Sequence, residues 1–160
     1  MKLYIKQKVF SWKDKFTVKN EYGEDKYYIE GQLLSLGKKL RVFDTYDREL
    51  VFVKQKLVSL LPKFFVEING EEVAEIVKKL SLFTPKYVVK GPEWDIRGDV
   101  FAHDYVISSG KNDIARIHKK WMAWGDTFEI DVMGPENELL ALGVVLAIDA
   151  VMDAQQNASA

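Results

Sequence analysis

The chain has 160 residues, with 23 basic and 24 acidic side chains, no cysteine and a formal net charge of −1. This length most simply forms one domain with a sizeable core, and the balanced charge argues against a dedicated nucleic-acid-binding protein. The absence of cysteine excludes disulfides, thiolate metal sites and cysteine nucleophiles. It is consistent with a reducing cytoplasm, which is the location that we expect.

Short segments with a two-residue periodicity, separated by turn residues, predict β-strands along most of the chain. Residues 1–8 mix apolar with charged side chains and predict a first strand rather than a secretory signal. Asn69-Gly70 lies between two apolar segments and predicts a tight hairpin, because a type I′ turn needs positive φ at both positions. Gly31 and Gly98 lie inside strand-like segments and predict bulges or bends.

Residues 71–83 have two interpretations. The apolar residues of this segment have helical spacing: Val73, Ile76, Val77 and Leu80. Ala, Glu, Lys and Leu, which favour helices, are frequent in it. We therefore expect a short helix or mixed turn that ends at Thr84-Pro85, because the residue before proline leaves the α region. The alternative is the return strand of the Asn69-Gly70 hairpin.

Five strand-like segments recur in the same order, which indicates an internal duplication of about residues 15–70 and 86–133. One match joins Tyr27-Tyr28-Ile29-Glu30-Gly31 to Trp94-Asp95-Ile96-Arg97-Gly98 through the pattern aromatic-x-Ile-charged-Gly. The other matches pair residues 16–20 with 87–91, 40–43 with 105–108, 51–56 with 115–120, and 64–68 with 128–132. With the first strand, the two halves give roughly twelve strands.

Residues 136–154 predict a helix that is apolar on every face. Such a helix must be surrounded by apolar protein or by lipid. Its apolar part, residues 139–152, is well short of the roughly 20 residues that span a bilayer, and it contains Asp149. We therefore expect a buried core helix rather than a membrane tail anchor, followed by a disordered polar tail at residues 155–160.

These elements predict one mainly β domain over residues 1–160. A sheet of roughly twelve strands tends to curl or close, and closure removes unpaired edges. A barrel of that size is too wide for its own side chains to fill. We expect a closed antiparallel barrel of two similar halves that encloses the hydrophobic C-terminal helix.

Few residues suggest catalysis or metal binding. His103 has Asp95 and Asp99 nearby in the sequence, but residues on one face of a strand lie two apart, so we expect a turn or strand-edge histidine and no metal ligand. Asp149 is expected to reach solvent at the barrel mouth, because an ionised carboxylate is costly in an apolar core. The alternative is a buried carboxyl with a raised pKa that transfers protons. No phosphate-binding glycine motif occurs, and no cofactor is expected.

The candidate binding residues are outward-facing cations on two equivalent strands. Alternation directs Val51 and Val53 of one strand inward, and Ala115 and Ile117 of the other. The outward-facing cations are Lys54, Lys56, Arg116, His118 and Lys120. They predict a groove for phosphorylated head groups, and the alternative is a solubilising surface of the barrel wall. Three tryptophans near loops are either interfacial anchors or part of core or rim packing: Trp12, Trp121 and Trp124.

The order of elements, the duplicated strand block and the terminal apolar helix resemble the LURP-one-related family of the tubby C-terminal-like superfamily. The segments that carry the resemblance are Tyr28-Ile29-Glu30-Gly31, Trp94-Asp95-Ile96-Arg97-Gly98 and residues 137–152. The resemblance implies a twelve-stranded barrel around a hydrophobic helix, with no established enzymatic activity. The wider superfamily includes tubby proteins, which bind phosphoinositides through basic side chains, and phospholipid scramblases. The chain has no residue-by-residue match to the tubby lipid-binding positions.

We therefore expect a non-enzymatic binding or scaffold module, for anionic phospholipid head groups or for a protein partner. It is expected to touch membranes peripherally, if at all, and not to be an integral membrane protein. One alternative is a scramblase-like protein that translocates lipid, which requires the C-terminal helix to leave the barrel. A second alternative is a metal-dependent enzyme that uses His103 with its neighbouring aspartates.

Overall fold

The computed structural model describes residues 1–6, 15–34, 37–56, 63–79, 82, 86–123 and 125–158. The strands in this part of the chain are β1 (Lys2–Lys6), β2 (Lys15–Asn20), β3 (Asp25–Leu34), β4 (Gly37–Phe43), β5 (Glu49–Lys56), β6 (Lys63–Ile68), β7 (Glu71–Lys79), β8 (Lys86–Lys90), β9 (Trp94–Asp99), β10 (Asp104–Ser109), β11 (Asn112–Met122) and β12 (Gly125–Val132). They are followed by a 3₁₀ turn, η2 (Pro135–Asn137), and a long helix, α1 (Glu138–Ala158).

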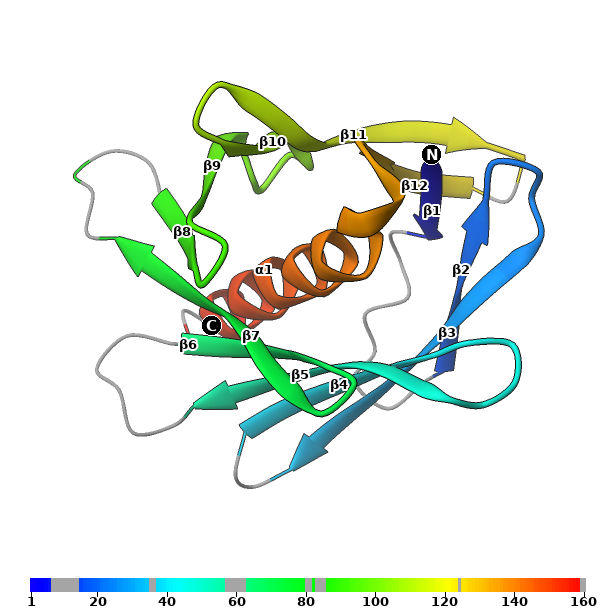
Figure 1. Ribbon diagram of the computed structural model, residues 1–160, viewed down its shortest axis with the longest axis horizontal. Coiled ribbons are helices and arrows are strands. Elements are labelled where there is room, and N and C mark those ends of the chain that lie inside the picture. Colours follow the sequence, from blue (N-terminus) through cyan, green and yellow to red (C-terminus); the bar gives the residue numbers. More distant parts are fainter. Residues whose placement is uncertain are drawn as a thin grey trace.

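The twelve strands form one closed antiparallel barrel. Each strand pairs with the next along the chain, and β1 also pairs with β12, which closes the sheet. Figure 1 shows the strands arranged around α1. The closed barrel and the enclosed helix confirm the predicted fold. The repeated segments lie on strands six places apart, as with residues 27–31 on β3 and 94–98 on β9.

Strand alternation directs apolar side chains toward α1. Val51 and Val53 on β5 are buried, as are Ala115 and Ile117 on β11, which confirms the inward faces predicted for these strands. The helix is buried at every residue from 141 to 152. It runs to residue 158, beyond the expected end at residue 154. None of the described helices is long and apolar enough to cross a membrane.

The helix lies close to the barrel wall at Gly143. A Cβ atom at this position would lie 2.7 Å from Val66 Cγ1 on β6 and 3.1 Å from Val51 Cγ1 on β5. Protein interiors are close-packed and leave no room for such an overlap. A glycine is therefore needed where α1 passes over β5 and β6.

Residues 71–79 form strand β7, and the predicted helix over residues 71–83 is wrong for this part. β7 pairs with β6 on one side and with β8 on the other, and its alternate residues Ala74 and Ile76 are buried. Helix propensity is a weak preference that pairing on both edges and burial of one face override. The segment is the return strand of a hairpin, which was the alternative interpretation.

The turn before β7 is the predicted one. Asn69 and Gly70 have φ angles of 52° and 82°, as a type I′ hairpin requires. The registers of β3 with β4 at Gly31 and of β9 with β10 at Gly98 continue without a shift, so the predicted bulges are absent there. Gly98 has φ of 117°, and a Cβ there would lie 2.6 Å from the Asp104 carbonyl oxygen, which fits the alternative of a bend.

The barrel has two different ends. We call the end where α1 begins the near end; its connections are residues 21–24, 44–48, 69–70, 91–93 and 110–111. The helix runs toward the far end, where β1, β3, β5, β7, β9 and β11 finish and the following strands begin. Pairing of the Lys38 ammonium, at the start of β4, with the Asp153 carboxylate fixes the helix at this end.

Candidate functional site

The predicted cationic residues lie on two opposite walls of the barrel. In the closed strand order, β6 to β10 separate β5 from β11 on one side, and β12 with β1 to β4 separate them on the other. Lys54 and Lys56 on β5 therefore cannot line the same groove as Arg116, His118 and Lys120 on β11. The predicted directions of these side chains are compatible with the structure, but the two groups form separate surfaces.

The β11 group surrounds a carboxylate that belongs to β12. Glu129 has no exposed side-chain surface, and its Oε1 lies 2.9 Å from Lys2 Nζ and 3.1 Å from His118 Nε2, while its Oε2 lies 2.7 Å from Lys120 Nζ. Burial alone would raise the pKa of Glu129, but hydrogen bonds from Lys120, Tyr4 and Lys2 outweigh burial and lower the pKa to about 2. These cations therefore already have an anionic partner.

Arg116 is also neutralised within the protein. Its Nε and its terminal nitrogen donate to Asp113 Oδ2 at 3.0 and 2.9 Å. A cation that shares an acid with its own strand attracts an external anion only weakly, because the local field is largely cancelled. The β11 surface is consequently a charge network more than an open anion site.

The β5 group is more open. Lys54 pairs with Glu67, while the Lys56 ammonium lies 5.2 Å from the centre of the Phe65 ring. These residues, with Gln55 and Glu72, line a cavity of about 310 Å³. Lys56 makes no ion pair within the described ranges.

Asp149 is buried and paired, so the expectation that it reaches solvent is wrong. Its Oδ1 lies 3.1 Å from His103 Nε2, and the residue is only 5% exposed. Burial raises the pKa of Asp149, and the contact with His103 opposes that rise. His103 occupies the turn between β9 and β10 with φ of 52°, and its ring stacks on Phe128 at 4.8 Å. The polar pair thus fastens α1 to a turn at the far end.

The acids near His103 in the sequence do not join this pair to form a metal centre. Asp99 Oδ1 accepts a hydrogen bond from the Ala102 backbone N–H at 3.0 Å, which closes the turn. Asp95 is exposed on the outer face of β9. Among the residues that the structure describes, no three His, Cys, Asp or Glu side chains form a group that could hold a metal ion.

Charge is sorted between the two ends of the barrel. To compare the two ends, we take the residues of each connection together with the two residues of the strand or helix on either side of it, and the first two residues of β1. At the near end, the acidic residues so defined are Glu21, Glu24, Asp25, Asp44, Asp47, Glu49, Glu67, Glu71, Glu72, Glu93, Asp95, Asp113, Asp131, Glu136 and Glu138. The basic residues there are Lys2, Lys19, Lys26, Arg48, Lys90 and Lys111.

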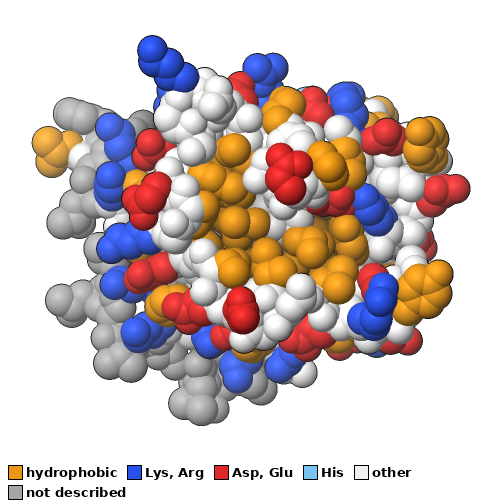
Figure 2. Space-filling model, in the orientation of Figure 1, with side chains coloured by type: hydrophobic (Ala, Val, Ile, Leu, Met, Phe, Trp, Pro, Cys, Tyr) orange, Lys and Arg blue, Asp and Glu red, His pale blue; other side chains and the backbone are white. Residues whose placement is uncertain are grey.

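The far end has the opposite balance. Its described basic residues are Lys6, Lys15, Lys38, Lys56, Lys63, Lys78, Lys79 and Lys86, against the strand and turn acids Asp99, Asp104 and Asp126 and the helix acids Asp149 and Asp153. Three of these lysines pair with carboxylates: Lys15 with Glu30, Lys38 with Asp153 and Lys63 with Glu75. In Figure 2, Lys and Arg side chains lie along the left edge, beside the residues drawn in grey, with several acidic side chains among them; acidic side chains also border the apolar area in the middle. The net charge close to zero is therefore the sum of a near end with more acidic residues and a far end with more basic residues.

Large apolar side chains are exposed among the lysines of the far end. Leu82 is 93% exposed between β7 and β8, Trp121 is 81% exposed near the end of β11, and Phe101 is 48% exposed in the turn after β9. Trp12 and Trp124, the other two tryptophans considered from the sequence, lie outside the described residues. Exposed apolar groups surrounded by cations mark an interaction surface.

Sequence reasoning missed most of this far-end surface. Lys78, Lys79 and Lys86 were not among the candidates; the first two lie in residues 71–83, which were expected to form a short helix or mixed turn. The available signal was the composition of alternate connections: residues 78–86 contain three lysines and no acid, whereas residues 69–72 contain two acids and no lysine. This difference in charged residues indicates two unlike ends of the barrel only once it is known that every second connection lies at the same end.

The structure defines a closed twelve-stranded antiparallel barrel that is filled by its own C-terminal helix and is polarised along its axis. The chain belongs to the LURP-one-related family, whose family model matches residues 1–149. This match confirms the resemblance found in the sequence.

Two individual proteins illustrate how far the similarity extends. YxjI of Bacillus subtilis (strain 168), described as an uncharacterized protein, is 34% identical over 152 residues, which cover 95% of this chain and 94% of YxjI. The X-ray structure of the Arabidopsis thaliana protein AT5G01750 matches with a TM-score of 0.61 at 13% identity, over 92% of this chain and 89% of that one. The second similarity concerns the fold alone.

Proposed function

We propose that this protein is a non-enzymatic binding module that attaches to anionic phospholipid surfaces through the far end of its barrel. The observation that carries the proposal is the sorting of charge: lysines at the far end and carboxylates at the near end. Each Lys or Arg close to an anionic membrane contributes about 1 kcal/mol of attraction. The polarised molecule would therefore approach a membrane with its far end first.

The exposed apolar residues of the far end support the same orientation. Leu82, Phe101 and Trp121 would enter the interfacial region of the bilayer, where Trp is favoured. A combination of lysines with inserted apolar groups gives reversible, peripheral attachment. Of the residues singled out from the sequence, Lys56 lies at this end and would contribute most, whereas Lys54 and Lys120 pair with Glu67 and Glu129. Arg116 and His118 lie further along the wall, next to their acidic partners.

In this proposal, the helix stays inside the barrel. Residues 141–152 of α1 fill the interior, and their removal would leave a large apolar cavity. This arrangement favours a peripheral module over a scramblase-like protein that inserts α1 into lipid. Hydrogen exchange of the α1 backbone amides, measured with and without vesicles, separates the two: retained protection supports the module, and lost protection supports insertion.

Vesicle co-sedimentation tests the proposal. Binding is expected to vesicles that contain phosphatidylglycerol, to be far weaker with phosphatidylcholine alone, and to decline with salt because the attraction is screened. The double variant Lys6→Glu/Lys56→Glu reverses two far-end charges that make no ion pair with other described residues, and it should weaken binding at least 10-fold. The matched control is Lys90→Glu/Lys111→Glu, which changes the net charge equally at the near end and should leave binding within 3-fold of the unaltered protein. Equal losses in both variants, or no preference for anionic vesicles, would overturn the proposal.

A further inference from the structure

The barrel wall has a gap between β8 and β9. The register of these two strands covers only Val88 with Asp95 and Val89 with Trp94. On its other side β8 stays paired with β7 as far as Lys86, and β9 stays paired with β10 as far as Asp99. The first residues of β8 and the last residues of β9 therefore diverge toward the far end.

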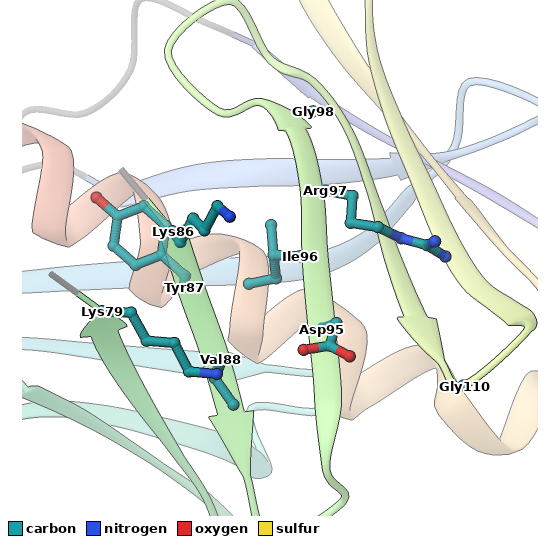
Figure 3. Close-up of a pocket in the computed structure, with 9 residues that line it drawn as sticks. All are labelled: Lys79, Lys86, Tyr87, Val88, Asp95, Ile96, Arg97, Gly98 and Gly110. Atoms are coloured by element: carbon teal, nitrogen blue, oxygen red, sulfur yellow. The ribbon is translucent and has the colours of Figure 1, made fainter. Parts of the chain in front are cut away.

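A cavity of about 470 Å³ occupies this gap, a volume within the range of small-molecule sites. Figure 3 shows the Lys86 side chain reaching into the space between the strands and the Lys79 ammonium lying beside Val88. The Arg97 side chain extends to the opposite side of β9, where its guanidinium donates to Ser108 Oγ at 3.0 Å. The cations that face the gap itself are thus Lys79 and Lys86, on its β7 and β8 side.

The two lysines are poorly neutralised within the protein. Lys79 and Lys86 are directly opposite each other in the register of β7 and β8, and opposed like charges destabilise a sheet. Neither makes an ion pair within the part of the chain that the structure describes, and residues 80–85 between them contain no acid. A bound anion would relieve this repulsion.

The lining of the cavity favours a phosphate ester. Lysine is a frequent phosphate ligand, and N–H groups of a diverging strand edge can add hydrogen bonds to phosphate oxygens. Asp95 also lines the cavity, and in Figure 3 its carboxylate lies on the β9 side. A carboxylate accepts hydrogen bonds from hydroxyl or ammonium groups, so it suits the polar alcohol part of such an ester.

We propose that the gap between β8 and β9 binds a phosphate ester, with Lys79 and Lys86 on the phosphate and Asp95 on a hydroxyl or ammonium group of the alcohol. The inference rests on the proposed function for the source of the ester, a phospholipid head group. Leu82 supports that source, because it is exposed in the connection between these two lysine-bearing strands and would face the lipid. A soluble phosphate ester shares the same chemistry.

Backbone amide NMR of the full chain tests the site. We expect glycerol 3-phosphate to shift the amides of Tyr87, Ile96 and Gly98, whereas glycerol alone leaves them unchanged. The double variant Lys79→Gln/Lys86→Gln should weaken binding at least 10-fold, both to glycerol 3-phosphate and to phosphatidylglycerol vesicles.

The control Lys6→Gln/Lys56→Gln removes the same charge at the same end, outside the cavity. It should leave glycerol 3-phosphate binding unchanged and weaken vesicle binding less than the cavity variant does, because it removes only the general attraction of two lysines. The amide spectra also verify that each variant is folded.

The possible failures are distinguishable. Vesicle binding without shifts at the gap, and with equal effects of the two double variants, would overturn the site and leave the proposed function standing. Shifts at the gap by glycerol 3-phosphate without any vesicle binding would overturn the proposed function and assign the site to a soluble ester. Binding of neither probe would overturn both.

Discussion

Glu129 is a buried carboxylate on the outer side of the barrel wall, and two lysines and the His118 ring cover it. We expect Glu129→Gln to lower the free energy of unfolding by about 1–3 kcal/mol at neutral pH, as for other hydrogen bonds to charged groups. Lys2 and Lys120 are partly exposed and can turn to water, which keeps the loss below that of a fully buried pair. Denaturant unfolding measures the change.

The effect of Glu129→Gln should depend on pH in a defined direction. The pKa of Glu129 is about 2 in the folded protein against 4.5 for a free carboxyl, so its ionised form stabilises the fold above pH 4.5. This contribution declines as the pH falls from 4.5 toward 2, and the difference between protein and variant should disappear there. Glu30→Gln is the matched control, because Glu30 pairs with an exposed lysine and should contribute at most about 1 kcal/mol. Equal effects of the two substitutions would contradict the argument.

Asp149 should show the opposite pH dependence. Burial raises its pKa above 3.8 in the folded protein, so the fold is more stable when this carboxyl is protonated. The contribution is complete below about pH 4 and is lost as the pH rises through the raised pKa. We expect Asp149→Asn to match the unaltered protein at pH 4 and to be more stable at pH 7, as measured by thermal unfolding. A variant that is less stable at pH 7 would show that the ionised pair with His103 stabilises the fold instead.

At the scale of elements, the contact of α1 with β5 and β6 depends on the missing side chain at Gly143. Alanine favours a helix over glycine by about 1 kcal/mol, but the added methyl would overlap Val66, and overpacking costs about 1–3 kcal/mol. We expect Gly143→Ala to be destabilising by up to about 2 kcal/mol in denaturant unfolding. The overlap is with one side chain, so Val66→Ala should relieve it.

A double-mutant cycle separates this packing effect from helix propensity. Val66→Ala alone should destabilise the protein through the cavity it creates. Combined with Gly143→Ala, the two losses should be clearly less than additive, because each residue makes room for the other. Additive losses would mean that the helix does not depend on the contact between these two positions.

The local pattern of apolar and turn residues predicted most of the elements. It failed where pairing with distant parts of the chain determines the structure. The alternation of β5 and β11 and the Asn69-Gly70 turn follow from short-range rules of direction and φ, so the sequence alone predicts them. β7 was predicted as a helix because Ala74 and its neighbours favour helices, whereas pairing with both β6 and β8 is a long-range effect. Asp149 was expected to reach solvent because His103, its partner, is distant in sequence and is positioned only by the folded turn.

At the scale of the whole molecule, the candidate site could not be predicted from composition. The net charge of −1 is a sum over two ends of opposite sign, and closure of the barrel determines which connections share an end. Closure also places β5 and β11 on opposite walls, so equivalence of strands in a repeat does not bring their side chains together. Matching residues of the repeated segments are therefore separated, and the proposed site consists instead of residues from neighbouring strands, above all the cationic ends of β7 and β8.

The polarity of the barrel makes a prediction about its orientation on lipid. The chain has no cysteine, so a single Leu82→Cys at the far end or Tyr46→Cys at the near end can carry an environment-sensitive fluorophore. Both native side chains are at least 80% exposed, which makes the two positions a matched pair. With phosphatidylglycerol vesicles, the label at position 82 should shift to the blue and gain intensity as it enters the interface, while the label at position 46 stays in water. The acidic near end is repelled by the same anionic surface that attracts the far-end lysines. A response at both positions, or at position 46 alone, would therefore contradict an orientation that is set by the distribution of charge.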